Sequence, residues 1–78
     1  MGLNHTSYIR YLKDANYYIG IHTQQRLGQA YYNSFRIIYP YLEDEIIHTE
    51  FDCFNDDSKL PAFLTWVQAR LDRLDSSK

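Results

Sequence analysis

The apolar residues of this chain recur at spacings of three and four almost throughout, and this period restricts the fold to helices. The pattern is clearest in the last third of the chain, where one apolar stripe is formed by Leu60, Phe63, Leu64, Val67, Leu71 and Leu74. Asp57 or Ser58 can cap this helix, and Pro61 fits a first turn that lacks internal hydrogen-bond partners. We therefore predict a helix over residues 59–74, followed by a frayed tail over residues 75–78.

The first helix is predicted over residues 6–16, with Thr6 or Ser7 as its cap and an inner face formed by Tyr8, Leu12 and Ala15. The segment 17–22 alternates in hydropathy, which is compatible with a short strand. Because a single strand has no partner with which to pair, we expect a connector at residues 17–22.

Two more helices are predicted in the middle of the chain. One covers residues 23–38, with Thr23 as its cap and an inner face of Leu27, Ala30, Tyr31, Ser34, Phe35 and Ile38. Glycine at position 28 lowers helix stability by about 1 kcal/mol relative to alanine. We expect that the close approach of another helix accounts for its presence. Pro40 favours a new helix over residues 40–48. The resulting prediction is a single all-α domain, residues 1–78, built as a compact bundle of four short helices.

The length of the chain limits the stability that it can gain from its own core. A chain of 78 residues buries little surface, so a second copy of itself is an expected source of stability, and we expect a homodimer.

Cys53 is the single cysteine, which excludes an internal disulfide and indicates a reducing interior. No signal peptide and no apolar run of the ~20 residues that a membrane span needs are visible. A cytoplasmic protein with no membrane partner is expected.

Eight tyrosines, all at or before Tyr41, suggest a contact surface. Each buried hydroxyl needs a hydrogen-bond partner, and a core of this size has few to offer. Some tyrosines are therefore expected at the surface, where tyrosine is a common recognition residue.

Charge is distributed unevenly along the chain. Residues 1–41 hold four basic residues against one acid, whereas residues 42–78 hold nine acids against four bases. Seven acids lie between Glu43 and Asp57, among them Asp44 and Glu50. Two interpretations stand: the halves pack together and neutralise one another, or the acidic stretch binds a basic partner.

Two helix faces are candidate protein-binding surfaces. On the last predicted helix, Trp66, Arg70 and Arg73 share one flank, and tryptophan and arginine are enriched in binding hot spots. The alternative is that Trp66 closes the core and Arg70 stacks on it. The other face, opposite the inner face of the predicted helix 23–38, is expected to be exposed and contains Gln25, Gln29, Tyr32 and Arg36.

Catalytic and cofactor chemistry has little support in the sequence. The only local group of metal-ligand type is His48, Asp52 and Cys53, which is too few ligands for a zinc site, so no metal and no cofactor are expected. Cys53 is expected to be a small buried residue with a raised pKa rather than a nucleophile, so the protein is predicted not to be an enzyme.

A nucleotide or nucleic-acid binder is the alternative function. The glycine-rich phosphate loop is absent and the sequence pI of about 5.8 argues against a general nucleic-acid binder. Binding of a small nucleotide, by tyrosine stacking and arginine contacts and for instance at a dimer interface, is therefore kept as the alternative. The candidate residues are Arg10, Tyr11, Tyr17, Tyr18, Arg26 and Arg36.

Residues 26–67 resemble a pattern found in small uncharacterised phage and prophage proteins. The matching positions are the run Arg26–Asn33, then Pro40, Leu42, Ile46, Thr49, Asp52, Phe54, Asp57, Phe63, Trp66 and Val67. Cys53 stands where the pattern leads us to expect proline. The resemblance implies a non-enzymatic accessory protein of the infected bacterial cytoplasm that binds and modulates or inhibits a host protein, such as a defence or nucleic-acid enzyme. It also implies that Asp52, Phe54 and Asp57 clasp a loop rather than form a catalytic centre.

Overall fold

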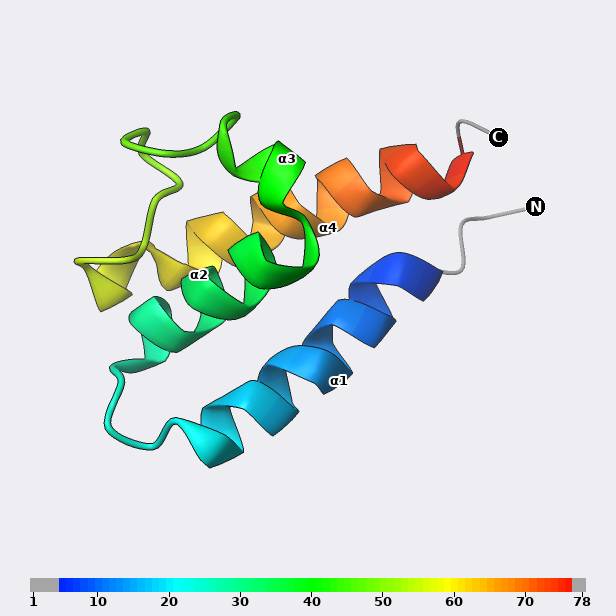
Figure 1. Cartoon of the computed structure of the whole chain (residues 1–78). Coiled ribbons are helices and arrows are strands. Elements are labelled where there is room, and N and C mark those ends of the chain that lie inside the picture. The colour runs from blue at the N-terminus through cyan, green and yellow to red at the C-terminus, as the bar shows by residue number, and fades with distance from the viewer. Residues whose placement is uncertain (1–4, 77–78) are drawn as a thin grey trace.

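The computed structural model describes residues 5–76, and within this range the secondary structure is all helical. The elements are α1 (Thr6–Ile21), α2 (Leu27–Ile38), α3 (Pro40–Glu43), the short 3-10 helix η1 (Asp57–Lys59) and α4 (Leu60–Ser76). Figure 1 shows α1 and α2 joined by a turn, with α3 and the loop that follows it at the opposite side of the molecule from α1. The predicted all-α bundle of four helices is confirmed. No helix among the described residues has the length and apolar character needed to cross a membrane.

The first helix is longer than predicted. α1 continues without a break through Tyr17 to Ile21, so the expected connector at residues 17–22 is wrong, and residues 5–76 contain no strand. The added turn is held by Tyr18, whose ring lies 4.1 Å from that of His22 and whose hydroxyl hydrogen-bonds the side-chain amide of Gln25. These contacts stabilise helical geometry beyond the predicted end.

Carboxylates from distant segments cap the first two helices. α2 begins at Leu27 rather than at Thr23, and Asp57 accepts a hydrogen bond from the Gly28 backbone N–H at 3.0 Å. At the start of α1, Asp75 accepts from the Ser7 backbone N–H at 3.1 Å and from the Ser7 hydroxyl. Both carboxylates occupy the positive end of a helix dipole.

The contact with Ser7 corrects the predicted C-terminal tail. Asp75 and Ser76 belong to α4 instead of fraying, and residues 77–78 of the predicted tail lie outside the described residues.

The predicted helix over residues 40–48 ends early, at Glu43. Beyond it, side chains bind the backbone: the Thr49 hydroxyl donates to the Ile46 carbonyl at 2.6 Å, and Asp52 accepts from the backbone N–H groups of His48 and Phe54. His48 has a φ of 63°, a left-handed backbone geometry that an α-helix cannot continue through. Such local bonds compete with continued helix and make residues 44–56 a structured loop.

The core lies between α1, α2 and α4 and is rich in aromatic rings. The apolar stripe predicted on α4 is buried or half-buried throughout. At the centre, Phe35 is fully buried and makes ring contacts at 5.7–5.9 Å with Tyr11, Tyr39, Phe63 and Trp66. The core therefore uses aromatic side chains from every long helix.

Most of the tyrosines are absorbed by this packing. Tyr11 and Tyr32 are buried, four others are half-buried, and only Tyr17 (75% exposed) and Tyr41 (63% exposed) face solvent. The predicted solvent position of Tyr32 is wrong, because α3 and the loop cover the face of α2 that was expected to be free. Tyrosine content by itself thus locates no binding surface.

Candidate functional site

A cavity of about 170 Å³ lies between α2, α3 and the loop 44–56. Its lining combines one base, two acids, an imidazole, a phenol, an amide and two apolar side chains, from Tyr32, Arg36, Glu43, Ile47, His48, Asp52, Phe54 and Asn55. A neighbouring cavity of about 220 Å³ shares His48, Asp52 and Asn55 with it. We call the first one the α2–loop cavity.

One wall of the α2–loop cavity joins a phenol, a carboxylate and a guanidinium. The Tyr32 hydroxyl donates to Glu43 Oε2 at 2.8 Å. Burial, and then this hydrogen bond, raise the pKa of Tyr32, so the phenol stays neutral at physiological pH. Arg36 Nη1 lies 3.8 Å from the same carboxylate oxygen, and the guanidinium lies 5.7 Å from the centre of the Phe54 ring. Glu43 and Phe54 therefore position Arg36 at the cavity.

The other wall is shaped by Asp52. Its two carboxylate oxygens accept hydrogen bonds from the backbone N–H groups of His48 at 2.9 Å and Phe54 at 3.0 Å. The first bond holds His48 in its left-handed conformation and fixes where the imidazole leaves the backbone. Asp52 thus clasps the loop between His48 and Phe54.

Three of the predicted protein-binding residues, Tyr32, Arg36 and Glu43, meet in this cavity, although they come from different elements. Asp44 and Glu50 are exposed on the loop 44–56, and Gln29 is half-buried on α2 outside the lining. The sequence analysis did not identify Ile47, Phe54 or Asn55 as residues that line a cavity. The resemblance placed Phe54 in a loop clasp, and no pattern in the sequence indicated a cavity.

The flank predicted on the last helix is largely used within the molecule. The Trp66 ring lies 5.9 Å from Phe35 and 6.4 Å from Phe51, which agrees with its closing the core. Arg70 donates through Nε and Nη2 to the two carboxylate oxygens of Glu45, at 3.0 and 3.1 Å, instead of stacking on Trp66. Arg73 is exposed.

Basic residues neutralise part of the acidic stretch. Arg26 pairs with Asp57, Arg36 lies near Glu43, and Arg70 binds Glu45. Hydrogen bonding to Arg70 lowers the pKa of Glu45, so this pair is kept at neutral pH and weakens in acid as Glu45 protonates. These pairs support mutual neutralisation within the fold and leave Asp44 and Glu50 as exposed acids.

The residues proposed for nucleotide binding do not form one site. Tyr11 is buried and donates to the Tyr31 carbonyl at 2.7 Å, so its ring offers no face for stacking. Arg26 donates to the Phe54 carbonyl at 2.8 Å as well as pairing with Asp57. Tyr18 is engaged at the end of α1, as described above, and Arg36 lies at the α2–loop cavity. Arg10 and Tyr17 remain exposed on α1.

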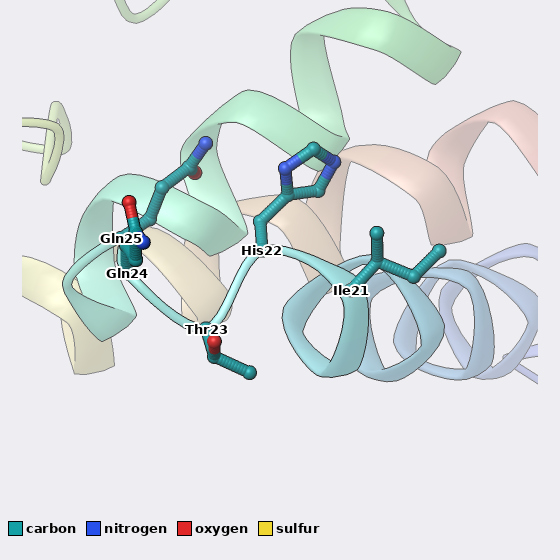
Figure 2. Close-up of a pocket in the computed structure, with 5 residues that line it drawn as sticks. All are labelled: Ile21, His22, Thr23, Gln24 and Gln25. Atoms are coloured by element: carbon teal, nitrogen blue, oxygen red, sulfur yellow. The ribbon is translucent and has the colours of Figure 1, made fainter.

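A further cavity, of about 220 Å³, is found at the turn between α1 and α2. Figure 2 shows that five consecutive residues line it, Ile21, His22, Thr23, Gln24 and Gln25, with Thr23 directed away from the side chains of Ile21 and His22. No carboxylate and no basic side chain other than His22 takes part. The cavity is a notch in one turn, with few groups to orient a ligand.

Cys53 is fully buried, and its thiol lies 3.3 Å from the Gly28 carbonyl, to which it donates. Burial, with smaller contributions from Asp52 and Asp57, raises the pKa of this thiol to about 12. We expect a thiol reagent such as DTNB to label the folded protein at neutral pH at least ~100-fold more slowly than the urea-unfolded chain, because only the exposed thiolate reacts.

The same raised pKa has a consequence for stability. The neutral thiol is favoured in the folded state, so its contribution to the free energy of unfolding is complete below pH 9 and is lost as the pH rises toward about 12.

In the labelling experiment, equal rates for the folded and the unfolded protein would show that Cys53 is accessible and available as a nucleophile.

The described residues contain no group of three or more His, Cys, Asp or Glu side chains arranged to hold a metal ion. Comparisons of the chain with protein-family models, with curated proteins and with solved structures gave no match.

Proposed function

We propose that this protein is a small non-enzymatic binding protein that docks on another protein through the surface around the α2–loop cavity. The observation that carries the proposal is Arg36, an arginine with a half-exposed side chain, held at a cavity mouth beside exposed Ile47 and His48. Arginine anchored next to apolar side chains is typical of interface hot spots.

The exposed acids of the same loop add a polar rim. Asp44 and Glu50 are exposed on the loop 44–56, which suits the rim of an interface better than its centre. The resemblance of residues 26–67 to small phage and prophage proteins favours a host protein as the partner, which this chain would modulate or inhibit by occupying a surface.

Capture with tagged protein from bacterial extract tests the proposal when wild type and variants are compared. We expect one stoichiometric partner with wild type, and about 30-fold weaker binding after Arg36→Gln, because removal of a hot-spot side chain costs about 2 kcal/mol or more. Arg10→Gln is the matched control, since it removes the same charge from the exposed face of α1.

Three outcomes would contradict the proposal. One is a partner that binds Arg36→Gln and wild type equally well. Another is the absence of any stoichiometric partner over a range of salt concentrations. The third is a second copy of the chain bound through this same surface, which light scattering would reveal as a homodimer of wild type that Arg36→Gln dissociates.

A further inference from the structure

Hydrogen-bond donors at the α2–loop cavity are left without acceptors. Within residues 5–76 the Arg36 guanidinium makes no hydrogen bond: its nearest carboxylate oxygen, on Glu43, is 3.8 Å away, and its plane is supported by Phe54. The His48 ring and the Asn55 side-chain amide likewise make no hydrogen bond within this range. An arginine alone supplies five N–H donors in a planar fork.

Three of the four carboxylate oxygens that line the same cavity are already engaged. Glu43 Oε2 receives the Tyr32 hydroxyl, and both oxygens of Asp52 receive backbone N–H groups. Among the lining groups that have no hydrogen-bond partner in residues 5–76, the N–H donors of Arg36 and Asn55 outnumber the remaining acceptors, such as Glu43 Oε1. The complementary ligand is therefore an acceptor. A carboxylate fits the guanidinium fork best, because two parallel N–H···O bonds can form.

Charge and shape narrow the class of ligand further. One base faces two acids in the lining, so a doubly charged phosphate meets more repulsion than a single carboxylate. Ile47 and Phe54 provide apolar surface beside Arg36, and the volume of about 170 Å³ suits a small group. The ligand is thus a carboxylate attached to an apolar group.

We propose that the α2–loop cavity binds a single carboxylate carried by an apolar group, with Arg36 as the anchor and His48 and Asn55 as further donors. This inference rests on the proposed function, in which the partner protein supplies that carboxylate from an apolar C-terminal residue. A free small acid has the same chemistry and is the other source that the experiment separates.

The test is an NMR titration of ¹⁵N-labelled protein with N-acetyl-leucine, which carries one carboxylate and an isobutyl group. We expect saturable shifts of the Arg36 Nε–H and of the His48 and Asn55 amide signals, with a Kd of about 1 mM. N-acetyl-leucinamide and inorganic phosphate should leave these signals unchanged. Arg36→Gln should abolish the shifts, while Arg10→Gln should preserve them.

A tetrapeptide that ends in a free leucine carboxylate separates the two sources. Binding about tenfold tighter than N-acetyl-leucine supports a protein C-terminus, because more surface is buried, and equal affinity supports a free small acid. Equal shifts with the leucinamide or with phosphate, or unchanged shifts in Arg36→Gln, would overturn the inference. If partner capture still depends on Arg36 in that case, the proposed function stands and only the carboxylate chemistry fails.

Discussion

Replacement of Phe35 by alanine is expected to lower the free energy of unfolding by about 3–5 kcal/mol, the usual cost of removing a fully buried phenylalanine. The Phe35 ring is fully buried and is surrounded by four other rings, three of which it meets edge to face. A domain of this size has a total stability of only about 4–12 kcal/mol, so the variant should be close to unfolding at 25 °C. Urea unfolding followed by far-UV circular dichroism measures the change.

Tyr17→Ala serves as the control for Phe35→Ala, because it removes an aromatic ring from the same protein at a site that is 75% exposed. We expect its stability to stay within about 0.5 kcal/mol of wild type. A loss below about 1 kcal/mol for Phe35→Ala would mean that Phe35 is not the centre of the core.

Gly28→Ala is expected to destabilise the protein by about 1–3 kcal/mol through overpacking, although alanine is the better helix former. A Cβ at this position would lie 2.6 Å from the Cys53 carbonyl oxygen and 2.7 Å from Asp57 Oδ1. Asp57 can move only by releasing the Gly28 N–H and Arg26, and Cys53 only by shifting backbone. The sequence correctly indicates close packing at Gly28, but the approaching groups come from the loop at Cys53 and from the short 3-10 helix η1 rather than from another α-helix.

Gly20→Ala is the matched control for Gly28→Ala, because no heavy atom lies within 4 Å of an added Cβ at this position in α1. Here the helix propensity of alanine acts unopposed and should raise stability by up to about 1 kcal/mol. Thermal unfolding of both variants measures the two effects. A rise in Tm for Gly28→Ala as well as for Gly20→Ala would be incompatible with the close contact at Cys53.

The candidate site was only partly predictable from the sequence. Arg36 and Glu43 were predicted as binding residues from their types and positions in the chain, but nothing in the sequence indicated that they share a cavity. Tyr32 was selected for a wrong reason, its supposed exposure, and enters the site through a hydroxyl that reaches Glu43 from a buried ring. His48 was considered only as a metal or thiol partner, and Asp52 also as part of the loop clasp that the resemblance implies. Their place at the cavity was not predicted, because bonds to the loop backbone have no periodic signature.

The sequence by itself determined the helical class and the buried stripe of α4, because apolar spacing acts through the local geometry of a helix. Only the tertiary structure decided where α2 begins, where α4 ends and which residues form the α2–loop cavity. The physical reason is that the deciding contacts join distant residues, such as Asp57 with Gly28 and Asp75 with Ser7, through one or two hydrogen bonds. Such bonds depend on positions that packing sets, and no local pattern encodes them.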